Sequence, residues 1–340
     1  MSEDYIDNMF NNNENNSKMI GIEYFQSGVE KFLEGMHDSA KQDFLLALEF
    51  DSSLVLSYCY LSSIYSDEND PDTSIELCNK GLSIDPENPH LHYCLGSAYD
   101  LKGLKYEAIS EYQWYHSEFA GDAECVFSMA NAYDDLGDLE NAKKYYQEVV
   151  NLDPEHCKAY FNWSLMEASC GDNDRAIICL KKAVEIAPKY WKAWIKLGIF
   201  SSRSGSIEEA IIAYSRALEL RPDLADVRYN LGISYKLIGK PDKAAEAFRG
   251  VVNLNNQDAN AWHNLGVALF QMGKNEEALE ALKRVIKIDL YHAEAHYRLA
   301  CVYVVQGEHE KAEKEKAFLK GIDKELFEGV ESMLEESLKK

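Results

Sequence analysis

The chain has 340 residues, of which 46% are hydrophobic, and a formal net charge of −23 at pH 7. Seven prolines and nineteen glycines are too few for a disordered chain, and no apolar run approaches the roughly 20 residues that a membrane-spanning helix needs. Residues 1–154 hold 30 acidic and 8 basic side chains, whereas residues 155–340 hold 28 and 27. This excess of negative charge in the first half argues against nucleic acid or an anionic membrane surface as partner, and its simplest role is solubility.

The chain begins with MSEDYIDNMFNNNENN, which is acidic and rich in asparagine. This segment has neither the basic start nor the apolar core of a secretory signal, and we expect residues 1–20 to be a disordered tail. The eight cysteines show no CxxC and no metal-ligand spacing. Because they are scattered as small apolar residues would be, we expect a cytoplasmic protein without metal or cofactor.

From residue 21 the chain repeats itself every 34 residues without insertion. The segments AWIKLG (193–198), VRYNLG (227–232), AWHNLG (261–266) and AHYRLA (295–300) hold the same place in successive repeats, and a glycine follows seven residues after each. The repeats start at residues 21, 55, 89, 123, 157, 191, 225, 259 and 293, so nine of them cover residues 21–326.

Each repeat predicts a pair of antiparallel helices. Large apolar residues recur at helical spacing, as Trp194, Leu197 and Tyr214 do in the sixth repeat, and form one buried stripe per helix. The mid-repeat glycine ends the first helix in a left-handed cap. Because proline restricts the residue before it, four dipeptides should stop second helices: Asp85-Pro86, Asp153-Pro154, Ala187-Pro188 and Arg221-Pro222.

Three features depart from this pattern. Asn69 stands where glycine is usual, so we expect a looser turn in the second repeat. Lys316 replaces a large apolar residue in the ninth repeat, which suits an end repeat with a solvated face. In residues 321–340 one helical stripe predicts a capping helix, whose end occupies 327–340; its members are Ile322, Leu326, Val330, Met333 and Leu334.

The period and its residues resemble the tetratricopeptide repeat (TPR) family over 306 of the 340 residues. The resemblance implies an all-α fold, a right-handed superhelical solenoid of helix-turn-helix repeats whose first helices line a concave groove. It also implies a non-enzymatic protein–protein interaction scaffold that binds an extended peptide or partner segment.

No enzyme motif accompanies the repeats. The sequence lacks GxGxxG, GxxxxGK[ST], HExxH and GxSxG. His292 and His296 are four residues apart and could form a metal pair on one helix face. However, His296 replaces the usual aromatic packing residue of a first helix and His292 lies at the turn between repeats, so we interpret both as structural. We therefore expect no catalytic residues and no metal site.

In TPR proteins the second, fifth, sixth, ninth, twelfth and thirteenth residues of each repeat face the groove. Here the fifth column is rich in aromatic residues, which suit the anchoring of bound side chains. The sixth column carries a partial row of asparagines, which resembles the asparagine ladder of the O-GlcNAc transferase family and could pair with a peptide backbone. Both columns are also consensus positions, so plain repeat packing remains an alternative. The candidate peptide-binding residues are Phe127, Asn131, Phe161, Asn162, Lys192, Lys196, Arg203, Tyr229, Asn230, Lys236, Asn264 and Arg298.

A second resemblance spans the fourth to sixth repeats. Asn131, Asn162, Lys192 and Lys196 occupy four of the five positions of the carboxylate clamp found in Hsp70/Hsp90 co-chaperones, which grips an acidic C-terminal tail. The first clamp position, normally lysine, is Phe127. A co-chaperone-type adaptor and a regulatory subunit of a larger enzyme complex are therefore alternatives to the peptide scaffold, and the partner and the oligomeric state stay open.

Overall fold

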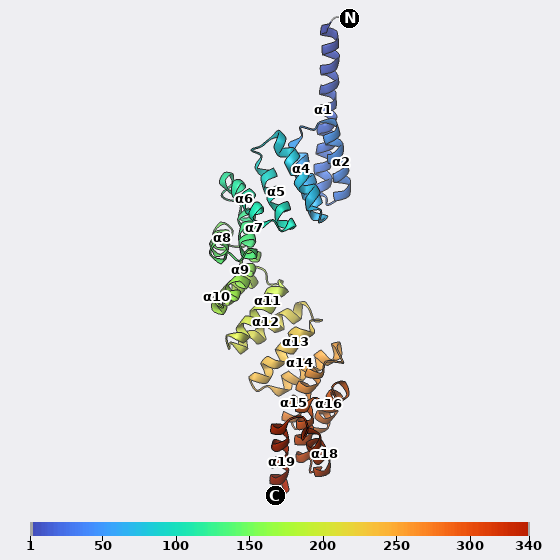
Figure 1. The fold of residues 1–340 in the computed structure, drawn as a ribbon, viewed down its shortest axis with the longest axis vertical. Helices are drawn as coiled ribbons and strands as arrows, with labels where there is room; N and C mark the ends of the chain where they lie inside the picture. Colours follow the sequence, from blue (N-terminus) through green and yellow to red (C-terminus); the bar gives the residue numbers. More distant parts are fainter. Residues whose placement is uncertain (1–2, 339–340) are drawn as a thin grey trace. The chain divides into compact units, whose positions relative to one another are not determined.

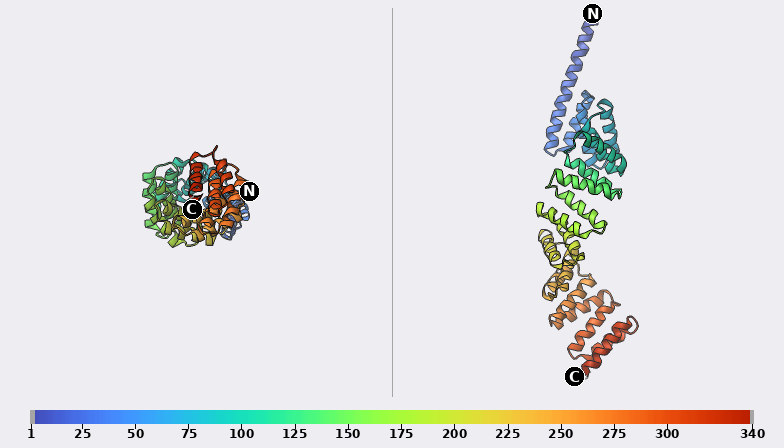
Figure 2. Two further views of the ribbon diagram at one scale, coloured as in Figure 1. Left: turned by 90° about the horizontal axis from the view of Figure 1, so that it is seen from below. Right: turned by 90° about the vertical axis from the view of Figure 1, so that its left-hand side faces the viewer.

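The computed structural model describes residues 3–338, and for residues 3–15 the backbone alone. Within that range the chain is helical throughout its regular structure and contains no strand, which confirms the predicted all-α repeat solenoid (Figure 1). The chain divides into two compact units, Met1–Met166 and Glu167–Lys340. The right-hand view of Figure 2 shows each unit as a row of paired helices. None of the helices in residues 3–338 is both long enough and apolar enough to cross a bilayer.

The helices of the first unit alternate between the first and the second helix of each repeat. They are α1 (Glu3–Leu33), α2 (His37–Phe50), α3 (Val55–Asp67), α4 (Pro71–Ile84), α5 (Pro89–Lys102), α6 (Lys105–Glu118), α7 (Ala123–Asp135), α8 (Leu139–Leu152) and α9 (Cys157–Ser169), whose last residues belong to the second unit. From α3 onward, each first helix begins at the residue where the 34-residue frame starts a repeat.

The second unit continues the same alternation and ends with one extra helix. Its helices are α10 (Asn173–Ile186), α11 (Trp191–Arg203), α12 (Ile207–Leu220), α13 (Ala225–Leu237), α14 (Pro241–Leu254), α15 (Ala259–Gln271), α16 (Asn275–Ile288), α17 (Ala293–Val305), α18 (His309–Leu319) and α19 (Lys324–Leu338). The second helices α4, α8, α10 and α12 each end one residue before a predicted X-Pro dipeptide, which confirms that stop signal.

The N-terminal segment differs from the expected disordered tail. Residues 3–20 form the first part of α1, and residues 1 and 2 lie outside the described residues. The helix of the first repeat is tied to α2, where Ser17 Oγ donates to the carbonyl of Phe50 at 2.9 Å. Extending an existing helix gains a hydrogen bond for each residue added, so an anchored helix can propagate into a segment that would not nucleate one.

The turns inside the repeats follow the predicted left-handed geometry. Gly137 and Gly205, for example, have φ values of 75° and 83°, a region that costs other residues energy. Asn69 adopts the same conformation, with φ 62°, so the turn of the second repeat is not the looser one expected. Asparagine tolerates this region better than most residues, and Asp70 caps the following helix by accepting from the Thr73 amide at 3.2 Å.

Small residues let the two helices of a repeat approach closely. A Cβ on Gly198 would lie 2.5 Å from Cε1 of Tyr214, and one on Gly232 would lie 2.7 Å from Cε1 of Phe248. Tyr214 and Phe248 are 2% and 0% exposed, so neither ring has room to move. One large ring on a glycine thus fixes the spacing of the first helix against the second in the first, third, sixth and seventh repeats.

α19 covers the last repeat as the predicted capping helix. It packs on α17 and α18, and Val330 and Leu334 are buried in the core that these helices share. Ile322 was wrongly placed on the apolar stripe, because it lies in the turn before α19 and is exposed. Lys316 is not on a solvated face either, since α19 covers it and its ammonium lies 5.7 Å from the ring of Phe327.

Candidate functional site

The first unit holds a cavity of about 370 Å³ between three successive first helices. We call it the groove cavity. Its lining residues are Phe32, Leu56, Cys59, Tyr60, Ser63, His90, Tyr93 and Cys94. All eight belong to groove columns of the 34-residue frame: the second, fifth, sixth, ninth and twelfth positions of the first three repeats. The columns predicted to face a ligand therefore meet at one hollow.

Aromatic rings form rigid walls of the groove cavity. The ring of Tyr60 stacks on that of Phe44, with centroids 4.9 Å apart, and meets the edge of Phe32 at 5.1 Å. On the opposite side Tyr93 packs against Tyr115 at 5.2 Å. Rings held on two sides do not collapse into a gap, so the hollow is preorganised for an inserted side chain.

Short side chains open the floor between these walls. Cys59, Ser63 and Cys94 leave the space that larger residues would fill. The hydrogen bond with Cys94, followed by burial, raises the pKa of the Cys59 thiol, so this thiol is neutral and the floor is largely apolar. All eight cysteines of the chain are free thiols.

A smaller and more polar cavity of about 150 Å³ adjoins the first. The two share Ser63, Tyr93 and Cys94, and the second adds hydroxyl groups and the exposed carboxylate of Asp67. The two cavities therefore lie side by side, the larger one mainly apolar and the smaller one more polar. Such a combination suits a ligand that presents an apolar side chain beside hydrogen-bond donors or a cation.

The candidate residues of the fourth and fifth repeats are largely engaged with one another. The Oδ1 atom of Asn131 accepts from Tyr146 Oη at 2.7 Å and from Asn162 Nδ2 at 2.8 Å. The ring of Phe127 lies 4.7 Å from that of His156, and Phe161 is half-buried in α9. Asn131 therefore serves as an internal acceptor, and its oxygen is less available to a ligand than the clamp resemblance implies.

The remaining clamp residues lie on α11 of the second unit. Lys192 is exposed, with its Nζ atom 5.7 Å from the centre of the Trp191 ring, and Lys196 is half-buried. Neither ammonium has a carboxylate within ion-pair distance among residues 16–338, whose side chains the structure describes. Arg203 ends the same helix, with its guanidinium 5.9 Å from the Phe200 ring.

Further along the second unit, a hydrogen-bonded row joins three of the predicted residues. Lys236 Nζ donates to Asn264 Oδ1 at 2.9 Å, and Asn264 Nδ2 donates to Tyr229 Oη at 3.0 Å. Asn264 is only 7% exposed, so its amide supports the neighbouring side chains rather than a free asparagine ladder. Asn230 and Arg298 lie half-buried on α13 and α17.

The structure also shows braces that we did not predict from the sequence. The fourth residue of a repeat hydrogen-bonds a backbone carbonyl six residues earlier, across the turn between repeats. The pairs are Tyr58 with Ser52, His92 with Pro86, Trp194 with Pro188, Arg228 with Pro222, Trp262 with Asn256, and His296 with Leu290. In most repeats the fourth residue carries a side chain with an N–H or O–H donor. This shared feature of the sequence could have revealed the brace.

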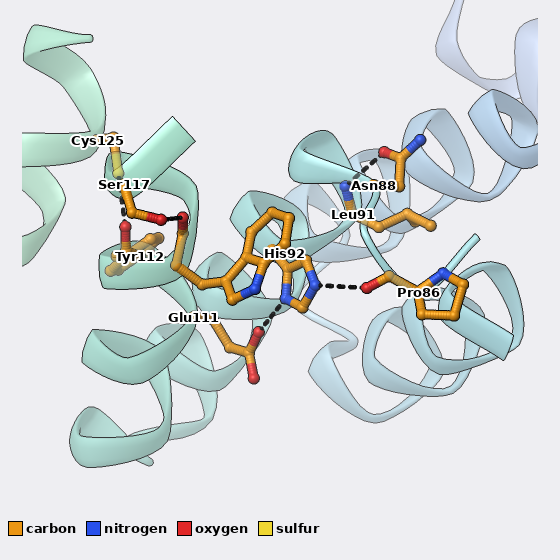
Figure 3. A network of polar contacts seen from close by, with 9 residues as sticks. Pro86, Asn88, Leu91, His92, Glu111, Tyr112, Ser117 and Cys125 are labelled. Carbon is orange, nitrogen blue, oxygen red and sulfur yellow. Dashed lines mark hydrogen bonds and ion pairs between the residues drawn. The ribbon is translucent and has the colours of Figure 1, made fainter. Parts of the chain in front are cut away.

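Figure 3 shows the histidine form of this brace, in which His92 lies between Pro86 and Glu111. Its Nε2 atom is 3.1 Å from the Pro86 carbonyl, its Nδ1 atom is 2.6 Å from Glu111, and its ring stacks on Trp114. His296 repeats the arrangement with Leu290, Glu315 and Phe318.

His292 and His296, the candidate metal pair, have separate roles. His292 Nδ1 accepts from the amide of Ala295 at the start of α17, and the ring of His292 stacks on that of His263 rather than turning toward His296. Among the described residues, no group of three or more potential ligands could hold a metal ion.

Three family models match the chain. Residues 126–253 match the middle TPR-like domain of cilia and flagella-associated protein 70, and residues 56–88 and 259–290 each match a tetratricopeptide repeat model. Among curated proteins none matches.

Solved structures with a similar fold are TPR proteins. The C-terminal part of a TPR repeat-containing protein from Cytophaga hutchinsonii is 13% identical, with a TM-score of 0.60, over 71% of this chain and 99% of that one. YrrB, described as a TPR protein with an unusual peptide-binding site, is 24% identical, with a TM-score of 0.49, over 54% and 95%. A tetratricopeptide repeat protein from Parabacteroides merdae is 19% identical, with a TM-score of 0.48, over 73% and 98%. At these identities the likeness concerns the fold alone.

Proposed function

Because the chain is a tetratricopeptide repeat protein, we propose that it is a non-enzymatic scaffold that binds an extended segment of a partner protein along the first helices of its first unit. The repeat fold suggests protein–protein interaction in general. The specific proposal depends on the groove cavity, whose eight lining residues all come from columns that face ligands in this family.

The groove cavity suits one large apolar anchor residue of the partner segment. Its volume of about 370 Å³ falls within the range of roughly 300–1,000 Å³ typical of ligand pockets. Anchor residues in preformed pockets supply most of the affinity of small interfaces. Burial of one such side chain is worth about 1.5–3 kcal/mol, or about a ten- to hundredfold gain in affinity.

The charge of the first half favours a partner with basic residues beside its anchor. Residues 1–154 carry a net charge of −22, and Asp67 lines the smaller cavity next to the groove cavity. A field of this sign speeds the approach of cations and opposes nucleic acid. We place this function in a reducing compartment such as the cytoplasm, which the eight free thiols support.

A co-chaperone-type adaptor is a second candidate function. Lys192 and Lys196 have no carboxylate partner among the side chains of residues 16–338, which leaves both ammonium groups for an acidic tail. Against it stand the packed ring of Phe127 at the first clamp position and the occupied oxygen of Asn131. The groove cavity is therefore the better-supported site.

To test this proposal, a large side chain is introduced to fill the groove cavity. Peptides of twelve residues are selected from a random library against the full chain, and their affinities are compared for the wild type, Ser63→Trp and Ser83→Trp. Ser63 lines the groove cavity, whereas Ser83 is exposed on the second helix α4. We expect Ser63→Trp to weaken binding at least tenfold and Ser83→Trp to leave it unchanged.

Circular dichroism shows whether each variant is folded, and Ser63→Leu replaces Ser63→Trp if the tryptophan is not tolerated. If the selected peptides bind the filled and control variants equally well, they do not use the groove cavity and the proposal is wrong.

A further inference from the structure

Two thiols from different repeats meet at the floor of the groove cavity. Cys59 lies on α3 and Cys94 on α5, and these two first helices pack directly on one another. The Sγ atom of Cys94 lies 3.8 Å from the carbonyl oxygen of Cys59, and a hydrogen bond joins the two thiols. The repeat fold therefore brings together two cysteines that are 35 residues apart in the chain.

Both thiols can be reached by a small molecule from the cavity side. The groove cavity has a volume of about 370 Å³ and is lined by Cys59 and Cys94, and Cys94 also lines the smaller cavity beside it. Cys94 is half-buried, and Cys59 keeps 8% of its surface exposed. Cys78 is fully buried and lines neither cavity, although it belongs to the same core. A solute the size of water can thus reach Cys59 and Cys94 but not Cys78.

The surroundings give the two thiols different roles. The hydrogen bond from Cys59 outweighs burial and lowers the pKa of the Cys94 thiol. The hydroxyl of Ser63, whose Oγ atom lies 3.8 Å from Cys94 Sγ, acts in the same direction. The pKa of Cys59 is raised by the same hydrogen bond. Because the thiolate is the reactive form of cysteine, Cys94 is the nucleophile and Cys59 is the neutral thiol beside it.

We propose that Cys94 and Cys59 form an oxidation site that reacts with hydrogen peroxide and thereby closes the groove cavity. The Cys94 thiolate attacks one peroxide oxygen, the O–O bond breaks, and the departing hydroxide takes up a proton to become water. The Cys59 sulfur then attacks the sulfenic acid on Cys94, its S–O bond breaks, and the oxygen leaves as water with the Cys59 proton. Two thiols are oxidised to one disulfide, and one peroxide is reduced to two waters.

The disulfide changes the shape of the groove cavity. Its sulfur atoms must lie about 2.05 Å apart, so α3 and α5 are drawn together and the floor between the walls of Tyr60 and Tyr93 narrows. Exchange with a small thiol reduces the bond and opens the cavity again. The oxidation chemistry is independent of the proposed function, whereas its effect on binding rests on that function.

The experiment counts free thiols in the full chain after treatment with a small molar excess of hydrogen peroxide. The chain is then denatured, its thiols are blocked with N-ethylmaleimide, and the intact mass gives the number of labels. Because the chain has eight cysteines, we expect six labels on the oxidised wild type and eight after reduction with dithiothreitol. Peptide mapping should place the disulfide between Cys59 and Cys94.

Single variants assign the role of each thiol. In Cys59→Ser the sulfenic acid on Cys94 has no thiol to attack it, so dimedone should trap it there. Cys94→Ser should keep all of its seven thiols free under the same treatment. Circular dichroism shows whether each variant is folded, and alanine replaces serine where it is not.

The matched control is Cys170→Ser, which removes an exposed thiol in the turn after α9. This variant should still lose two thiols on oxidation. Eight labels on the oxidised wild type, or a loss of two thiols in Cys94→Ser, would overturn the oxidation site. Absence of a dimedone adduct in folded Cys59→Ser would overturn the assignment of Cys94 as the nucleophile.

Peptides selected against the reduced chain test the closure of the groove cavity. We expect the oxidised wild type to bind them at least about tenfold more weakly, with recovery after dithiothreitol, and peroxide-treated Cys94→Ser to bind them as before. If oxidation leaves their affinity unchanged while Ser63→Trp weakens it, the closure is wrong and the proposed function stands. If Cys59 and Cys94 pair as expected but Ser63→Trp has no effect, the proposed function fails and the oxidation site stands.

Discussion

Replacement of Phe248 by alanine tests how the seventh repeat positions its groove-facing helix. Phe248 is 0% exposed, its ring packs on Gly232, and it meets the ring of Tyr229 at 5.5 Å. Phe→Ala changes in a core cost about 3–5 kcal/mol, because apolar contacts are lost and a cavity remains. The aromatic pair adds about 0.5–1.5 kcal/mol to what the ring contributes, so we expect a loss near the upper end of that range.

Hydrogen exchange is the suitable assay, because a long repeat array need not unfold in one step. Amides of α13, α14 and α15 should lose protection by an amount equivalent to about 4–5 kcal/mol. Amides of α2–α6 should keep theirs, since stability in repeat arrays depends on neighbouring repeats. The control is Leu237→Ala, at a side chain that is 63% exposed and should cost less than about 0.5 kcal/mol.

A loss below about 1 kcal/mol for Phe248→Ala, or one equal to that of Leu237→Ala, would refute this reasoning. It would mean that the ring on the glycine does not hold the two helices together. A uniform loss of protection along the whole chain would instead refute the nearest-neighbour description of the array.

Three further predictions concern other parts of the chain. Burial lowers the pKa of His296, but the hydrogen bonds to Glu315 and to the Leu290 carbonyl outweigh it, so the pKa lies above the ordinary 6.5. The stability that the protonated ring contributes is therefore present below about pH 6.5 and is lost as the pH rises through the raised pKa. Urea unfolding at several pH values should show this decline in the wild type and a flatter one in His296→Gln. If an acidic C-terminal tail docks on α11, Lys192→Glu should weaken it at least about tenfold (~1.4 kcal/mol), whereas Lys182→Glu on α10 should not, and equal effects would exclude the clamp. Deletion of residues 293–340 should lower stability yet leave the first seven repeats protected in hydrogen exchange, and global unfolding would contradict this.

The repeat architecture was readable from the sequence because its determinants are local. The 34-residue frame places a glycine at each left-handed turn and proline after several second helices, and both act within a few residues. Asn69 shows the limit of prediction from local sequence. We expected a looser turn without glycine, but Asn69 adopts the left-handed conformation itself and the turn is kept. The composition of residues 3–20 did not predict a helix, because these residues continue α1 from its anchored part in the first repeat.

The candidate site was less predictable, because it depends on packing between repeats. The family resemblance predicts which columns face a ligand. It does not predict that polar side chains in these columns, such as Asn131 and Asn264, form hydrogen bonds with other residues of the chain. The groove cavity opens where short side chains such as Ser63 and Cys94 fall between fixed rings. Column position alone does not say where such a gap will lie.

Photo-crosslinking tests the proposed binding surface most directly. A photoreactive residue is placed at position 63 or, as control, at position 83, and the full chain is irradiated with a peptide selected against the wild type. We predict that the peptide crosslinks from position 63, inside the groove cavity, and not from position 83 on the second helix α4. Crosslinking from position 83 with none from position 63 would show that partners dock on the second helices, and would contradict the proposed groove.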